Sequence, residues 1–167
     1  MAPLVARVPV PEAWRFLLVR PRLGQGLSGN AEADAFQRLA PMEAETTAEL
    51  SRLLLQEVLP AVQQADIETA GEGLYEYGRI SGDVFAEAQG GTISDPGMAR
   101  LVEWARGEGI RGIGQSSWGP TIWMLCSGAA ESEELAAVVC AFAGTEAVEV
   151  TTASPRNRGA DVCRACD

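Results

Sequence analysis

Two short apolar segments separated by a polar, glycine-containing centre constrain the fold of this chain most. They span residues 110–115 and 121–126, within GIRGIGQSSWGPTIWMLC, and their composition indicates two strands. Strands that follow each other through so short a connection pair side by side and antiparallel. We therefore expect an antiparallel hairpin, with the polar centre Gly114–Thr121 at one end of the sheet.

Hydrophobic periodicity predicts two more strands and a series of helices around this hairpin. A strand is expected at 14–21, where an apolar run ends at Pro21, and another at 147–154, where Val148 and Val150 alternate with polar residues. The glycine-rich stretch 22–30 is expected to be a loop. Helices are expected at 31–39, from Thr46 through Val62, from Asp66 to about Ala88, from Asp95 to Gly107 and from Ser132 to Gly144.

Capping residues predict where three of these helices start. Thr46 followed by Glu49 is a capping-box pattern, and Asp95 followed by Pro96 is typical of an N-cap and a first helical residue. Ser132 is expected to cap the last helix. The inward-facing positions of that helix are expected to be Leu135, Val138, Val139 and Phe142.

Two helices carry residues that disfavour helical structure. Pro60 lacks a backbone N–H and is expected to kink or weaken its helix. The helix from Asp66 contains four glycines, each of which costs about 1 kcal/mol relative to alanine. We expect these glycines to let another backbone approach closely; they are Gly71, Gly73, Gly78 and Gly82.

The order of elements predicts the fold class. Without the extra helices the chain is β-α-β-β-α-β, the split-βαβ or ferredoxin-like arrangement. We expect an α+β domain with a four-stranded antiparallel sheet, helices on one face and additional helices in the first crossover. Residues 1–167 are expected to form this single domain, with a frayed tail from about residue 155.

Composition excludes several classes of function. The net charge is −10, which disfavours binding to nucleic acid. No run reaches the roughly 18 apolar residues of a membrane span, and the start of the chain lacks a signal-peptide pattern; we expect a cytoplasmic location. All 13 basic residues are arginine and histidine is absent. Histidine-dependent triads, Schiff-base lysines, Walker loops and histidine metal sites are therefore excluded within this chain.

The four cysteines indicate no clear metal or redox centre. Cys126 and Cys140 lie in apolar patterns and are expected to be small core residues. Cys163 and Cys166 form a single C-x-x-C pair near the end of the sequence. A zinc site needs four ligands and a redox pair usually opens a helix, so we expect a frayed tail here, with metal or redox chemistry as the alternative.

The polar centre of the hairpin is the main candidate ligand site. Glycines let backbone N–H groups approach an anion, and hydroxyl and amide side chains add donors. The alternative is that this segment is only a long hairpin connection and binds no ligand. Trp118 is either a wall for a planar ligand or a core anchor. The candidate residues of this loop are Gly114, Gln115, Ser116, Ser117, Trp118, Gly119 and Thr121.

Two pairs of arginines and one polar turn are weaker candidates. Arg20 and Arg22 follow the first strand, and Arg156 and Arg158 follow the last. Arginine is suited to forked contacts with phosphate. The alternative is that these arginines are only solvated residues at the ends of strands. Gln89, which is followed by two glycines, is a further candidate for contact with substrate.

The string Gln115-Ser116-Ser117-Trp118-Gly119-Pro120-Thr121 resembles the third motif of the GHMP kinase superfamily, in the form found in the family of beta-ribofuranosylaminobenzene 5'-phosphate synthases (beta-RFAP synthases). The stretches VPVPEAWRFLLVRP, GLSGNAEADAF, FAEAQGG and SPRNRGA fit the same family, in the same order. The resemblance implies a pentosyltransferase that joins phosphoribosyl pyrophosphate to 4-aminobenzoate or 4-hydroxybenzoate. Carbon dioxide and pyrophosphate leave, Mg²⁺ accompanies the pyrophosphate, and the product enters methanopterin biosynthesis.

The resemblance covers the C-terminal half of that family's pattern. The family's N-terminal phosphate loop, glycine- and serine-rich, has no match here, and LGQGLSGN is its nearest candidate. We therefore expect the chain to need a missing N-terminal half or a separate partner chain, to be inactive alone and to form a homodimer as the family does. The alternatives are a stand-alone module that binds a small anion and a small-molecule kinase of the same superfamily.

Overall fold

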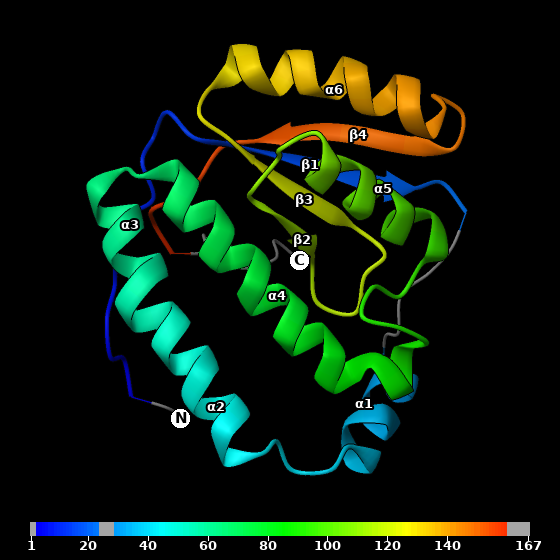
Figure 1. The fold of residues 1–167 in the computed structure, drawn as a ribbon. Helices are drawn as coiled ribbons and strands as arrows, with labels where there is room; N and C mark the ends of the chain where they lie inside the picture. The colour runs from blue at the N-terminus through cyan, green and yellow to red at the C-terminus, as the bar shows by residue number, and fades with distance from the viewer. Residues whose placement is uncertain (1–2, 24–28, 160–167) are drawn as a thin grey trace, which may run out of the picture.

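The computed structural model describes residues 3–23 and 29–159, which form one antiparallel sheet and its covering helices (Figure 1). The strands are β1 (Arg15–Pro21), β2 (Ile113–Gln115), β3 (Ile122–Cys126) and β4 (Val148–Ala153). The helices are α1 (Gly29–Arg38), α2 (Ala44–Arg52), the π-helix η1 (Leu53–Val58), α3 (Leu59–Gln64), α4 (Ile67–Gln89), α5 (Pro96–Gly107) and α6 (Ala129–Ala143).

The strand order β2-β3-β1-β4 confirms the predicted ferredoxin-like sheet. All three strand pairings are antiparallel. In the register Val19 lies opposite both Ile122 of β3 and Val150 of β4. The loop between β2 and β3 therefore lies at the end of the sheet where β1 finishes and β4 begins.

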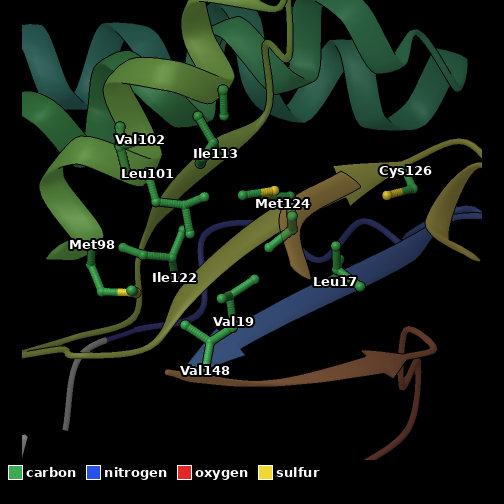
Figure 2. Close-up of a cluster of buried hydrophobic side chains, with 12 residues drawn as sticks. Leu17, Val19, Met98, Leu101, Val102, Ile113, Ile122, Met124, Cys126 and Val148 are labelled. Carbon is green, nitrogen blue, oxygen red and sulfur yellow. The ribbon is translucent and has the colours of Figure 1, made fainter. Parts of the chain in front are cut away.

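One face of the sheet carries the main core, which α5 and α6 cover. Alternate strand residues, including Leu17, Val19 and Met124, point into it and are fully buried. Figure 2 shows these side chains packed against the apolar face of α5. The α5 residues in this cluster are Met98, Leu101, Val102 and Ala105.

The opposite face of the sheet is also covered, in contrast to the expectation of helices on one face only. Trp123 and Leu125 point away from the main core because strand side chains alternate. They belong to a second cluster with residues of η1, α3 and α4, among them Val58, Val62 and Ala70. The extra helices of the first crossover thus supply the cover for this second face.

Two of the four glycines of α4 let another backbone approach closely, as the sequence predicts for all four. A Cβ on Gly71 would lie 2.8 Å from the backbone nitrogen of Gly112, directly before β2. A Cβ on Gly82 would lie 2.5 Å from the carbonyl oxygen of Thr92. Gly78, in contrast, has no neighbour within 4 Å of its Cβ position.

Two predicted helix starts are wrong. Helix α2 begins at Ala44 after Glu43, whose side chain makes no cap; Glu49 instead holds Arg52, at 2.7 and 2.9 Å. Helix α6 begins after Gly128. Its start is stabilised by Glu131, which accepts the backbone N–H of Ser127 at 2.6 Å.

The predicted burial of α6 is also only partly right. Ser132 is fully buried inside the helix, and its hydroxyl bonds that of Thr152 on β4 at 2.8 Å. Val139 is buried, but Val138 and Phe142 are about half exposed, so they do not face inward. Phe142 stacks instead on Trp104 of α5, with ring centroids 4.5 Å apart.

Two further expectations about helices agree with the structure. The Asp95 side chain accepts the Met98 N–H at 2.9 Å, and Pro96 opens α5. The turn before α3 is π-helical, which is the expected disturbance near Pro60. Among the described residues, no helix combines the length and the apolarity that crossing a bilayer requires.

Candidate functional site

The β2–β3 loop is a tight turn that presents two serines to solvent. The Ser116 N–H donates to Thr121 O and the Gly119 N–H donates to Ser116 O, each at 2.9 Å. Ser116 and Ser117 are exposed. The turn leaves the backbone N–H groups of Ser117 and Trp118 without an acceptor among the described residues. Two hydroxyls and two N–H groups on one turn form a set of donors suited to an anion.

The side chain of Gln115 holds this turn in place. Its Oε1 accepts the N–H and the hydroxyl of Ser94, at 2.7 and 2.9 Å. Its Nε2 donates to Ser117 O at 2.9 Å and to Gln89 Oε1 at 3.1 Å. All four hydrogen-bonding positions of the amide are therefore used within the protein. Gln115 organises the loop and has no donor left for a ligand in this structure.

The hydrogen bond from Gln115 to Ser117 offsets a strained backbone. Ser117 has φ +52°, a left-handed conformation that costs a residue with a side chain about 1–2 kcal/mol. A hydrogen bond contributes about 1 kcal/mol to stability. The two magnitudes are similar, so this one hydrogen bond is large enough to offset the backbone cost at Ser117.

Glycines at positions 114 and 119 allow close contacts. A Cβ on Gly119 would lie 2.3 Å from Ser94 Oγ and 2.7 Å from Gln115 Oε1, and its φ is +67°. A Cβ on Gly114 would lie 2.8 Å from the Trp123 ring. Both glycines serve the packing of the loop and of the strand beneath it.

Trp118 is a buried anchor of the loop. Its exposed fraction is 5%. The ring centroid lies 4.9 Å from that of Phe85 on α4 and 5.2 Å from that of Phe36 on α1. Of the two roles considered for Trp118, the structure shows the packing role, and the three rings join α1, α4 and the loop.

The two arginine pairs lie at opposite ends of the sheet. Arg20 and Arg22 end or follow β1, so they lie at the same end as the β2–β3 loop. Arg156 and Arg158 follow β4, whose last residue pairs with Phe16 near the start of β1. Only the first pair shares an end with the loop. Arg20 there forms an ion pair with Glu149 at 2.5 Å, which lowers the pKa of the Glu149 carboxyl.

Gln89 belongs to the loop network, together with residues that sequence patterns did not single out. Gln89 Nε2 donates to Thr92 O at 2.9 Å while its Oε1 accepts from Gln115. Ser94, Phe36 and Phe85 were missed as site residues. The only sequence signal for Ser94 was its place beside the helix cap Asp95. Most of the LGQGLSGN stretch, residues 24–28, lies outside the described residues.

A groove of about 820 Å³ lies near the site, between α1, the connection after it and α4. No residue of the β2–β3 loop lines it. Its walls combine apolar side chains with charges of both signs. The charged residues are Arg38, Glu43, Arg79, Asp83 and Glu87.

Possible metal ligands and cysteine thiols are the remaining candidates for chemistry in the described part of the chain. No three or more His, Cys, Asp or Glu side chains gather there in a way that could hold a metal ion. Cys126 is buried, as predicted, and burial raises the pKa of its thiol to about 11. Cys140 is partly buried, and the Cys163–Cys166 pair lies outside the described residues.

The fold and this loop place the chain in a known family. Residues 58–144, just over half of the chain, match the model of the family described as GHMP kinases C terminal. The chain therefore belongs to the GHMP kinase C-terminal family, in agreement with the resemblance of its loop.

Two curated relatives are similar along nearly the whole chain, and both are named beta-ribofuranosylphenol 5'-phosphate synthase. The relative from Methanothermobacter thermautotrophicus is 30% identical over 158 residues, covering 95% of the chain and 46% of the relative. The one from Archaeoglobus fulgidus is 30% identical, covering 96% and 48%. The chain thus spans about half the length of the curated relatives it matches.

Solved structures of the same fold are more distant in sequence. Homoserine kinase from Cytophaga hutchinsonii has a TM-score of 0.56 at 15% identity, covering 90% of this chain and 44% of the kinase. Mevalonate diphosphate decarboxylase from Enterococcus faecalis has a TM-score of 0.53 at 18% identity, covering 86% and 44%. These similarities support the fold alone.

Proposed function

We propose that this chain is the C-terminal domain of a synthase that joins phosphoribosyl pyrophosphate to 4-hydroxybenzoate or 4-aminobenzoate in methanopterin biosynthesis. The observation that carries the proposal is 30% identity along 95% of the chain to a synthase of a ribofuranosylphenol phosphate. A phenol product corresponds to the 4-hydroxy substrate, so 4-hydroxybenzoate is the substrate we favour.

The proposed reaction makes few demands on protein side chains. The bond from the ribose carbon to pyrophosphate breaks, and the ring carbon that bears the carboxylate forms the new bond to that ribose carbon. The bond to the carboxylate then breaks, and its electron pair restores the aromatic ring as carbon dioxide leaves. Such a site must position two substrates, neutralise phosphate charge and exclude water. None of these tasks requires histidine or lysine.

The β2–β3 loop supports this proposal through its exposed donors. In the proposal, the hydroxyls of Ser116 and Ser117 and the free N–H groups of the turn bind a phosphate or the benzoate carboxylate. Arg22 adds positive charge at the same end of the sheet, where the charge of Arg20 is already paired with Glu149. Mg²⁺ accompanies the pyrophosphate group, bound to phosphate oxygens and water.

The natural gene product that contains this chain provides the test. It is incubated with phosphoribosyl pyrophosphate, Mg²⁺ and 4-hydroxybenzoate labelled in the carboxyl carbon, and labelled carbon dioxide is collected. Release that depends on phosphoribosyl pyrophosphate supports the synthase. No release, together with a rise in melting temperature with ATP but not with phosphoribosyl pyrophosphate, supports a kinase of the same family. Binding of pyrophosphate without any turnover favours the anion-binding module.

Replacing Ser116 and Ser117 together by alanine is expected to weaken binding of phosphoribosyl pyrophosphate about 100-fold or more. Hydrogen bonds to a charged group contribute about 1.5–3 kcal/mol each, and two are lost. Isothermal titration calorimetry measures the change. Ser154→Ala, an exposed serine just beyond β4 at the other end of the sheet, is the matched control. Unchanged affinity in the double variant would remove both hydroxyls from the site.

A further inference from the structure

The strongest feature not used by the proposed reaction itself is the hydrogen-bond network behind the β2–β3 loop. It joins Gln115 at the end of β2 to two residues more than 20 positions earlier: Gln89 at the C-terminal end of α4, and Ser94 in the α4–α5 connection. Figure 1 shows the α4–α5 connection beside this loop. We propose that Gln89 and Ser94 are positioning residues, which act through the Gln115 amide to hold Ser116 and Ser117 in their binding arrangement. This inference rests on the proposed function of the loop.

The network allows only one orientation of the Gln115 amide. Both partners of Oε1 come from Ser94 and are donors, while both partners of Nε2, Gln89 Oε1 and Ser117 O, are acceptors. A flipped amide would place its NH₂ group against the Ser94 N–H and its oxygen against two oxygens. Three of the four hydrogen bonds would become mismatched contacts, since only the Ser94 hydroxyl could turn and accept from the flipped amide. Ser94 and Gln89 therefore dictate that the amide donates toward Ser117.

Gln89 is itself oriented by the backbone. Its Nε2 donates to Thr92 O at 2.9 Å and to Gly82 O at 3.5 Å, so its Oε1 is the atom that turns toward Gln115. The backbone of the α4–α5 connection thus orients the Gln89 amide, Gln89 orients the Gln115 amide, and Gln115 in turn holds the carbonyl of Ser117. A displacement of α4 relative to the sheet would therefore change the positions of Ser116 and Ser117.

The arrangement also keeps negative charge away from the exposed donors. The three side chains of the network, Gln89, Ser94 and Gln115, are neutral amides or a hydroxyl and lie partly buried behind the turn. A carboxylate at position 115 or 89 would supply an acceptor of the same shape. It would also place an anion beside a loop proposed to bind phosphate. Neutral amides provide both a donor and an acceptor without that repulsion.

Gln89→Met tests the proposal, because methionine has a similar length and cannot hydrogen-bond as an amide does. We expect two changes in the natural gene product. Hydrogen exchange of the peptide that covers the β2–β3 loop becomes about fivefold faster, since the protected Ser116 and Gly119 N–H groups open more often. The dissociation constant for phosphoribosyl pyrophosphate with Mg²⁺ rises about fivefold, without a change in the exchange of β1 or β3.

Two further variants separate positioning from a general loss of stability. Ser94→Ala removes the hydroxyl donor but keeps the backbone donor, so a smaller change of about twofold is expected. Gln63→Met on α3, an exposed glutamine outside the network, should change neither quantity. Loop exchange in Gln89→Met equal to that of the unmodified protein would overturn the proposal. Because exchange is measured without ligand, failure of the unmodified protein to bind phosphoribosyl pyrophosphate would count against the proposed function alone.

Discussion

Replacing Gly119 by alanine is expected to reduce synthase activity at least 100-fold and to destabilise the protein by about 2–4 kcal/mol. The new Cβ would lie 2.3 Å from Ser94 Oγ and 2.7 Å from Gln115 Oε1, so both partners of the loop network would have to move. The φ of +67° adds a backbone penalty of about 1 kcal/mol or more for any residue with a Cβ. Carbon dioxide release and thermal unfolding measure the two effects.

Gly107→Ala serves as the control for this variant. Gly107 ends α5, and a Cβ there would have no neighbour within 4 Å. Activity and melting temperature should stay close to those of the unmodified protein. If Gly119→Ala kept full activity, the close packing between the loop and Ser94 would not matter for the reaction.

Replacing Gly71 by alanine is expected to destabilise the protein by about 3 kcal/mol. Its Cβ would lie 2.8 Å from Gly112 N and 3.0 Å from Gly112 Cα. Backbone atoms cannot rotate away as a side chain can, so α4 and the segment before β2 must separate, and overpacking of this kind costs about 1–3 kcal/mol or more. For a protein of this size the melting temperature should fall by about 8 °C, which calorimetry measures.

The same helix offers the control. Gly78→Ala places its methyl group in open space and removes a poor helix former. The expected change is a stabilisation of about 0.5–1 kcal/mol. A similar loss of stability in both variants would show that helix propensity, and not contact with Gly112, decides the result at position 71.

Features that depend on neighbours in sequence could be predicted. The hairpin around the β2–β3 loop follows from two apolar segments and a polar centre, and the Asp95 cap follows from a local pattern. The ferredoxin-like strand order followed from the order of elements. The hairpin and the cap are stabilised by interactions between residues close in sequence. The strand order is that of a common fold, which the order of elements is enough to indicate.

Features that depend on competing or distant partners could not be predicted. Glu49 matches a capping box, but Arg52 is three residues away and takes its carboxylate. Serine is a favoured N-cap residue, so Ser132 was expected to start the last helix. The Glu131 side chain instead accepts hydrogen bonds from Ser127 and stabilises an earlier start of α6. Periodicity gives no information about which of several acceptors a side chain will choose.

The candidate site shows the same division. Sequence patterns identified the residues of the loop, including Gln115, Ser116 and Ser117. They could not show that Gln115 is fully occupied by Ser94 and Gln89, which lie 21 and 26 residues earlier in the chain. Nor could they show that the two arginine pairs lie at opposite ends of the sheet, because that depends on the register of β1 with β4.

The central position of β1 has a consequence for folding during synthesis. Of the four strands β1 is made first, yet its two neighbours, β3 and β4, follow only after α1 to α5. Long loops must close before those pairings form, which is slow compared with helix formation. The helices from α2 to α4 can assemble while β1 still has no partner. Because synthesis proceeds from the N-terminus, β1 lacks both of its strand partners until β3 and β4 are made.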